Sequence, residues 1–151
     1  MTKYTYDYPM PSCAATAAIF CCDHLLLIKR KEDPFKDRWA LPGGFMNLSE
    51  DLLTTCVREV IEETSLDVHP CRFRYHGMRD EVERDPRGRV IDNVYSVVIN
   101  FAESLKTKAA DDATEFMWHE ITEGKYAKLP PLAFDHESSL RLVLEQRGLL
   151  K

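Results

Sequence analysis

Residues 41–66 read LPGGFMNLSEDLLTTCVREVIEETSL, and the interpretation of the whole chain starts from this stretch. Two glycines precede a segment of helical periodicity, in which each residue is rotated by about 100° from the previous one. Glu59, Glu62 and Glu63 therefore share one arc of roughly 100°. A separate arc carries the apolar stripe expected to be buried: Leu53, Cys56, Val57, Val60 and Ile61. The pattern predicts a glycine turn followed by a helix over about 50–64.

The start of this helix has two candidate N-caps. Asn47 and Ser49 both carry side chains that commonly occupy an N-cap, and Asn47 with Glu50 has the spacing of a capping box. The two glycines before them, Gly43 and Gly44, permit backbone angles that other residues avoid and let the main chain approach a ligand closely.

The acidic arc has two explanations. Carboxylates at i, i+3 and i+4 lie about 5–6 Å apart between Cβ atoms. At an effective dielectric near 20, two full charges at that range repel by roughly 3 kcal/mol. A solvated face would relieve this repulsion through water, and it is the usual explanation for an isolated Glu-x-x-Glu-Glu. The alternative is a hard divalent cation bound through carboxylate oxygens.

The residues in front of the helix favour the cation, because together with it they resemble the motif of the Nudix hydrolase family. That motif is G-x5-E-x7-R-E-U-x-E-E-x-G-U, where U is a bulky aliphatic residue. The matching positions are Gly44, Glu50, Arg58, Glu59, Val60, Glu62, Glu63 and Leu66. The one departure is Ser65, where the family has a glycine that ends the helix. A left-handed turn costs a non-glycine residue on the order of 1 kcal/mol, so the geometry is expected to differ there.

Length and composition set bounds on the fold and on the function. The chain has 151 residues, enough for one domain with a substantial core, and its formal net charge is −5. That charge argues against a non-specific nucleic-acid binder, which would carry a basic excess. We expect one Nudix domain over residues 1–151 with a short N-terminal arm over about 1–11, stopped by Pro9 and Pro11.

Cysteine usage points to a cytoplasmic protein. The five cysteines have no paired Cys-x-x-Cys spacing and no secretory signal precedes them, which favours reduced thiols buried as small hydrophobes. These residues are Cys13, Cys21, Cys22, Cys56 and Cys71. No apolar run approaches the ~20 residues that a membrane span needs.

Periodicity outside the motif predicts strands with two interleaved helices, the pattern of an α/β protein. The expected elements are a hairpin of 14–22 and 25–29, strands over 68–75, 90–101 and 116–119, and a helix from a cap at Asp135 to about Arg147. Within the longest strand, alternation puts four residues on one face: Tyr95, Val97, Ile99 and Phe101. The resemblance implies a Nudix-type α/β/α sandwich around a mixed sheet.

The resemblance also implies a pyrophosphohydrolase that uses Mg²⁺, or Mn²⁺ in its place. In family terms Glu59 and Glu63 are the main metal ligands, and Glu62 supports them or binds directly. A backbone carbonyl near Gly43 or Gly44 would complete the coordination. Divalent ions held in this way neutralise a pyrophosphate, activate a water and stabilise the leaving phosphate.

Catalytic roles are expected for four residues of the motif. These are Glu59, Glu62, Arg58 and Glu50, with Arg58 orienting a carboxylate such as Glu50 through its planar fork. The general base stays open between a motif glutamate and an acid from a late loop. The loop candidates are Asp111, Asp112 and Glu115.

Substrate choice depends on residues outside the motif. Residues 6–9, 33–45, 84–90 and 110–113 look like the ADP-ribose pyrophosphatase branch, which implies cleavage of ADP-ribose to AMP and ribose 5-phosphate. The expected substrate-binding residues are Trp39, Arg84, Arg87 and Arg89, with a Tyr or Phe stacking on adenine.

The sequence leaves two alternative functions open, and the resemblance also bears on the oligomeric state. A nucleoside triphosphate pool-sanitising enzyme would use the same helix. A non-catalytic ADP-ribose sensor belongs to the same branch, although its members carry a winged helix after the domain and this chain ends at Lys151. The resemblance favours a homodimer, with the arm that carries Tyr4, Tyr6 and Tyr8 as a candidate for exchange between protomers, and no nucleic acid or membrane as partner.

Overall fold

The strands form one mixed sheet between two helices. A computed structural model describes residues 3–110, 112–122 and 128–150. Its elements are β1 (Ser12–Cys21), β2 (His24–Arg30), β3 (Trp39–Ala40), β4 (Gly43–Phe45), α1 (Leu52–Thr64), the 3-10 turn η1 (Pro70–Arg72), β5 (Arg74–Arg79), β6 (Val90–Ile99), α2 (Phe101–Ser104), β7 (Ala113–Glu120) and α3 (His136–Gln146).

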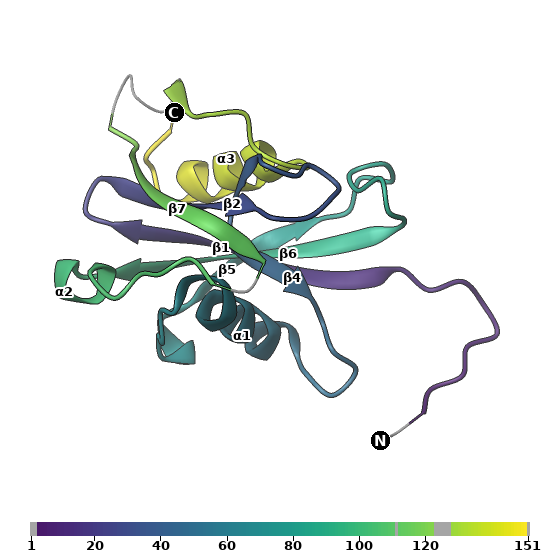
Figure 1. Cartoon of the computed structure of the whole chain (residues 1–151). Coiled ribbons are helices and arrows are strands. Elements are labelled where there is room, and N and C mark those ends of the chain that lie inside the picture. Colours follow the sequence, from purple (N-terminus) through teal and green to yellow (C-terminus); the bar gives the residue numbers. More distant parts are fainter. Residues whose placement is uncertain (1–2, 111, 123–127, 151) are drawn as a thin grey trace.

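The sheet has the order β3-β2-β1-β6-β5, with β4 also paired to β1 and β7 to β2. β1 and β6 run parallel over their full length, and the other pairs are antiparallel. Figure 1 shows α1 on one face of the sheet and α3 on the other. The predicted α/β/α sandwich around a mixed sheet is therefore confirmed.

Strand β1 lies at the centre because it is apolar on both faces. Ile19 belongs to the cluster under α1, whereas Phe20 belongs to the cluster under α3. Successive side chains of a strand point to opposite faces, and a strand buried on both sides reads as a continuous apolar run. On α1, Cys56 and Val60 are buried while Ile61 is 40% exposed, so the buried stripe is narrower than predicted.

Two predicted strands end differently in the structure. Residues 68–75 form η1 followed by the start of β5, because Pro70 has no N–H for a sheet ladder and fits the first turn of a helix. The longest strand stops at Ile99 instead of residue 101. Asn100 caps α2 in a reciprocal capping box with Glu103, which removes Phe101 from the strand and leaves it exposed.

The ends of α1 correct two further predictions. Asp51, and neither Asn47 nor Ser49, is the N-cap, because its Oδ1 accepts from the Thr54 N–H at 2.7 Å. Ser65 ends the helix in the left-handed conformation, with φ 60°, and its N–H donates to the Ile61 carbonyl. Serine thus takes the conformation that glycine would, and the expected difference in geometry does not occur.

The cysteines are free thiols, but they are not uniformly buried. Cys21 and Cys56 lie in the core, whereas Cys22 and Cys71 are exposed. Cys22 is exposed because it falls in the turn after β1, with a positive φ, instead of in the strand. No helix of the described residues is long and apolar enough to cross a membrane.

Candidate active site

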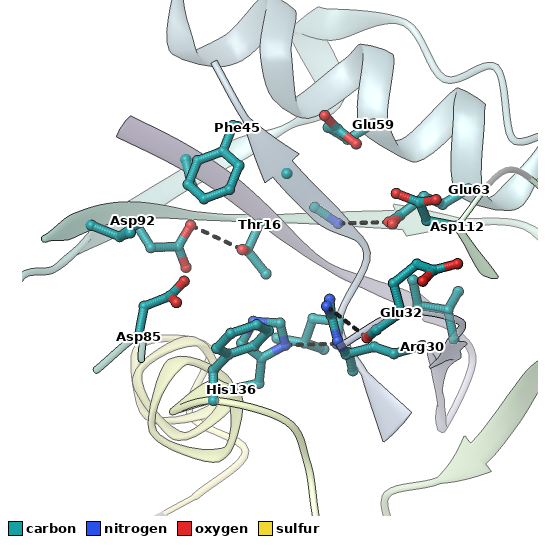
Figure 2. A pocket seen from close by; sticks show the side chains of 18 of the residues that line it. Thr16, Arg30, Glu32, Phe45, Glu59, Glu63, Asp85, Asp92, Asp112 and His136 are labelled. Carbon is teal, nitrogen blue, oxygen red and sulfur yellow. Dashed lines mark hydrogen bonds between the residues drawn. The ribbon is translucent and has the colours of Figure 1, made fainter. Parts of the chain in front are cut away.

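One cavity of about 340 Å³, a size typical of small-molecule sites, is lined by four residues of the motif: Gly44, Arg58, Glu59 and Glu63. Figure 2 shows Glu59, Glu63 and Asp112 on one side and Asp85 and His136 on the other. The charged and aromatic residues that line the cavity are Arg30, Lys31, Glu32, Asp33, Phe45, Arg58, Glu59, Glu63, Arg84, Asp85, Arg87, Asp92, Asp112, Phe134 and His136. Gly43 and Gly44 complete the lining beside α1.

Arg58 holds three motif carboxylates together. Its Nε and Nη2 donate to the two oxygens of Glu50 at 2.8 and 3.1 Å. Its Nη1 donates to Glu59 at 2.6 Å and to Glu62 at 2.9 Å. The hydrogen bonds from Arg58, with those from Asn47, lower the pKa of Glu50 to about 2, so Glu50 stays ionised. Glu50 and Glu62 do not line the cavity themselves.

Glu63 is buried beneath the glycine turn. Its Oε2 accepts from the Gly43 N–H at 2.8 Å, as Figure 2 shows. Burial raises the pKa of Glu63 to about 8, with repulsion from Glu59 and Asp112 adding to it and the Gly43 N–H acting against it. A buried carboxylate with two acidic neighbours is an environment that positive charge would stabilise.

The two glycines are required by close contacts. A Cβ on Gly44 would lie 2.4 Å from the carboxylate of Glu59. A Cβ on Gly43 would lie 2.5 Å from the Ala15 carbonyl and 2.8 Å from the Cα of Thr16. Gly44 therefore leaves room for an acidic side chain, whereas Gly43 lets β4 approach the backbone of β1.

The donor chemistry of this end of the cavity fits a hard divalent cation, because Glu59, Glu63 and Asp112 supply carboxylate oxygens there. Among the described residues, no three His, Cys, Asp or Glu side chains are already arranged as a ligand set. Arg58 and the Gly43 N–H hold the motif glutamates by hydrogen bonds. Binding of a cation would exchange some of these hydrogen bonds for metal ligation.

The structure places the three arginines predicted to bind substrate in different surroundings. The side chain of Arg84 is 4% exposed and pairs with Asp135 at 2.5 Å and with Asp92 at 3.5 Å. Arg87 makes a bidentate pair with Asp85 at 3.0 and 2.7 Å. Both line the cavity, but their charges are balanced by carboxylates. Arg89 lies outside the lining and donates to backbone carbonyls of the same loop.

Arg30 is a cavity residue, although the basic run to which it belongs, Lys29-Arg30-Lys31, is more typical of a solvated strand end. Its guanidinium donates to the carbonyls of Pro34 and Glu32 and lies 4.8 Å from the centroid of the Phe134 ring. No carboxylate within residues 3–110, 112–122 or 128–150 forms an ion pair with it. Burial, with Arg87 nearby, lowers the pKa of Arg30 from its usual range. Arg30 is the last residue of β2 and comes after a continuous run of four buried residues, so no alternation marks the face to which it points.

The remaining predicted residues lie in different places. Trp39 packs against the cluster under α3 and is not part of the lining. Asp112 lines the cavity, whereas Glu115 pairs with Lys29 on the exposed side of β2 and β7. Asp111 falls outside the described residues.

Asp135 and Asp92 have roles that the sequence did not indicate. Asp135 was expected to cap α3, but its side chain makes no cap hydrogen bond and accepts from Arg84 instead. Asp92 is 1% exposed and accepts from the Thr16 hydroxyl at 2.9 Å. Burial raises the pKa of Asp92 to about 6, against the attraction of Arg84. No local pattern marks these residues, because their partners are far away in the sequence.

This fold and site define a class: an α/β/α sandwich protein whose first helix presents carboxylates to a cavity that also holds arginines. The family model described as the NUDIX domain matches residues 11–143. The chain belongs to the Nudix family. Its class within that family is the Nudix pyrophosphohydrolases, and Nudix hydrolases use divalent metal ions.

Two relatives and one solved structure illustrate the similarity. An ADP-ribose pyrophosphatase of Methanocaldococcus jannaschii is 39% identical over 134 residues, which are 89% of this chain and 73% of the relative. An ADPR-responsive transcriptional repressor, NtrR, of Acinetobacter baylyi is 34% identical over 141 residues, covering 89% of this chain and 54% of the repressor.

The solved structure is that of a bifunctional NMN adenylyltransferase/ADP ribose pyrophosphatase from Francisella tularensis, complexed with AMP and a Mn ion. It superimposes with a TM-score of 0.83 at 28% identity, over 93% of this chain and 43% of that chain. The present chain thus spans about half the length of the repressor and less than half of the bifunctional enzyme.

Proposed function

We propose that this protein is a Mg²⁺-dependent pyrophosphohydrolase that cleaves ADP-ribose to AMP and ribose 5-phosphate. The observation that carries the proposal is that one cavity holds both Glu59, Glu63 and Asp112 and the guanidinium of Arg30. Carboxylates suit the cation that a pyrophosphate requires, and an arginine without a carboxylate partner in the described chain suits the phosphate oxygens. Mn²⁺ is the expected substitute for Mg²⁺.

Each residue has a separate task in this proposal. Glu59 and Glu63, with Glu62 beside them, would hold the cation, and the backbone of Gly43 and Gly44 would approach it closely. When bound, the cation supplies charge neutralisation and an activated water. Arg58 keeps Glu50 and Glu59 oriented through the hydrogen bonds described above. Arg30 would bind a phosphate oxygen, because its guanidinium is already fixed by two carbonyls and an aromatic ring.

The general base remains a choice between a motif glutamate and a loop acid. Asp112 lines the cavity, which favours it over Glu115 among the loop candidates. A comparison of Asp112→Asn with Asp111→Asn and Glu115→Gln would decide this. Loss of turnover in one of these variants alone would assign the base to the loop, and turnover near that of the wild type in all three would leave a motif glutamate.

Support for ADP-ribose as the substrate comes from the relatives. The archaeal relative and the Francisella structure both carry the name ADP-ribose pyrophosphatase, and the latter was complexed with AMP, which is a product of the proposed reaction. The test is a phosphate-release screen over ADP-ribose, nucleotide sugars, dinucleotides and nucleoside triphosphates, with Mg²⁺, Mn²⁺ or EDTA. Turnover of a triphosphate without turnover of ADP-ribose would replace the substrate claim with the pool-sanitising alternative.

The variant Glu63→Gln tests the metal role. We expect its turnover to fall at least about 100-fold, because an amide is a weaker ligand for a hard cation and removes one negative charge from the cluster. The Gly43 N–H can still donate to the amide oxygen, so the fold should be retained. Thermal unfolding checks the fold, and turnover near that of the wild type would contradict the assignment.

A sensor function is the second candidate, and the similarity to an ADPR-responsive repressor favours it. A sensor would bind ADP-ribose without releasing AMP in the presence of Mg²⁺. Calorimetric titration beside the hydrolysis assay separates the two functions, since binding without turnover supports the sensor.

The homodimer and the exchange of the N-terminal arm are tested by light scattering of the full chain and of a variant that lacks residues 1–8.

A further inference from the structure

His136 begins α3 and lies at the end of the cavity away from α1 (Figure 2). Its Nδ1 accepts a hydrogen bond from the backbone N–H of Leu41 at 3.0 Å. A neutral imidazole has one acceptor nitrogen and one N–H, so this bond fixes the proton on Nε2. The chain segment before the glycine turn therefore sets the tautomer of a histidine that is 95 residues away.

The Nε2–H of His136 is available to a ligand. Within the described residues Nε2 has no hydrogen-bond partner. It also does not belong to the side-chain nitrogen and oxygen atoms that are fully buried and lack a partner. The residue is 7% exposed and lines the cavity. Because Nδ1 is bonded to Leu41, the Nε2–H is the donor that this ring can offer to a ligand in the cavity.

The surroundings keep this donor uncharged. Burial lowers the pKa of His136 to about 4; Asp135 and Asp85 act in the opposite direction, and Arg84 and Arg30 reinforce the shift. The ring of Phe134 lies 5.4 Å away between centroids and is tilted by 37°. A neutral N–H beside an aromatic face differs in character from the carboxylate end of the same cavity, where a cation and phosphates would bind.

We propose that His136 is a specificity-determining residue that donates from Nε2 to an uncharged acceptor atom on the part of the substrate held away from α1. The proposal rests on the proposed function, in which α1 engages the pyrophosphate. Two atoms of a nucleotide have the required chemistry: a ring nitrogen of the base, or an oxygen of a ribose. A substrate that lacks the acceptor would leave the Nε2–H buried and unpaired, which costs more than a formed hydrogen bond gains.

Two substitutions separate the two nitrogens of His136. In His136→Asn, the amide oxygen can replace Nδ1 as the acceptor for the Leu41 N–H, but nothing replaces the Nε2–H. In His136→Gln, the longer side chain carries an amide N–H to the region of Nε2 but gives up the contact with Leu41. If His136 only stabilised the fold, the order of the two variants would be reversed. His136→Asn would then stay closer to the wild type than His136→Gln, both in activity and in stability.

The test measures KM and kcat for the wild type and both variants with ADP-ribose and Mg²⁺. We expect His136→Asn to raise KM by about 10-fold, with a smaller effect on kcat, because a neutral hydrogen bond from a fixed donor is lost. We expect His136→Gln to recover most of that loss. Thermal unfolding of each variant should show that the melting temperature of His136→Asn is close to that of the wild type.

Substrate analogues identify the acceptor. The base arm uses ADP-ribose with 1-deaza, 3-deaza or 7-deaza adenine, and the sugar arm uses analogues that lack single ribose hydroxyls. For the analogue that lacks the relevant atom, wild type and His136→Asn should have equal KM, whereas the 10-fold difference should persist for the others. The same ratio for every analogue, or equal KM on ADP-ribose itself, would overturn the proposal.

Failure of the proposed function gives a different result. In that case the wild type itself would not hydrolyse ADP-ribose, and the same three proteins would be compared on the nucleotide that the phosphate-release screen identifies. If the wild type bound ADP-ribose without turnover, dissociation constants would replace KM in the same comparison. Either way, an unchanged affinity in His136→Asn rejects the role of His136.

Discussion

At the scale of single residues, Arg58 shows how the motif works before any cation is bound. One guanidinium contacts Glu59 and Glu62, which share one arc of α1, and also Glu50, which lies outside the helix. Arg58 therefore offsets the repulsion among the three carboxylates. Its hydrogen bonds to Glu50, followed by those to Glu59, raise the pKa of Arg58 despite partial burial. Arginine at this position keeps the cluster stable and oriented.

Gly44 gives a prediction at the same scale. In Gly44→Ala, the new methyl group would meet the end of the Glu59 side chain, which can move aside, so the protein should fold but hold Glu59 out of place. We expect turnover to fall by about 10- to 100-fold, the range typical of misplaced metal-site groups. Turnover is measured with Mg²⁺ as the cation.

The matched control is Gly43→Ala, where the contacts are with backbone atoms of Ala15 and Thr16. Backbone cannot move aside, so this substitution should destabilise by about 1–3 kcal/mol and lower the melting temperature by several degrees. Equal losses of stability in both variants would contradict the distinction between the two glycines.

At the scale of elements, α1 is defined by its ends as much as by its faces. Asp51 caps it, which leaves Glu50 outside the helix and free to turn toward Arg58. The C-terminal end is closed by Ser65 in the left-handed region, a conformation that disfavours residues with a Cβ. Both ends help to position the acidic face.

Replacing Ser65 by glycine should stabilise the protein. Glycine adopts φ 60° without a Cβ penalty, so we expect a gain of up to about 1 kcal/mol in the free energy of unfolding, or about 2–4 °C in melting temperature. Ser65→Ala is the control and should not gain, because alanine keeps the Cβ. A melting temperature of Ser65→Gly below that of the wild type would show that the serine side chain contributes more than its conformation costs.

At the scale of the whole molecule, the cavity gathers side chains from β1, β2, β4, α1, β6, α3 and the loop before β6. Arg30 and Arg89 test this arrangement. We expect Arg30→Ala to lower kcat/KM by about 10- to 100-fold, as for the loss of a charged hydrogen bond. Arg89→Ala should have a much smaller effect because Arg89 lies outside the lining. The reverse order of effects would favour the substrate role first expected for Arg89.

The stability of the whole molecule should depend on pH through His136. Its pKa is about 6.5 unfolded and about 4 folded, so between these values the unfolded chain binds the proton and the folded chain does not. The contribution of neutral His136 to the free energy of unfolding is complete above pH 6.5 and is lost as the pH falls to 4. The loss between pH 7 and 5 should amount to about 2 kcal/mol.

Denaturant unfolding of the wild type and His136→Asn at several pH values measures this dependence. The difference between the two proteins isolates His136 from Asp92, whose raised pKa of about 6 acts with the opposite sign. We expect the wild type to lose about 2 kcal/mol more than the variant on going from pH 7 to 5. Parallel curves would contradict a neutral buried His136.

The sequence by itself determined the parts of this protein that depend on local periodicity. The glycine turn, the helix with Glu59, Glu62 and Glu63, the hairpin of β1 and β2, and the α/β class follow from spacing and pattern. The α/β/α sandwich was implied by the resemblance to the Nudix family. The position of Ser65 was also read correctly as the helix end, although its conformation was not.

Only the tertiary structure decided which side chains share the cavity. Arg30, Phe134 and His136 come from segments about 100 residues apart, and Arg84 and Arg87 are neutralised by carboxylates. Which strand faces meet, and which charges find partners there, depends on long-range packing that no short window of sequence contains. Local pattern therefore specified the chemistry of α1, and the assembled fold specified what surrounds the substrate.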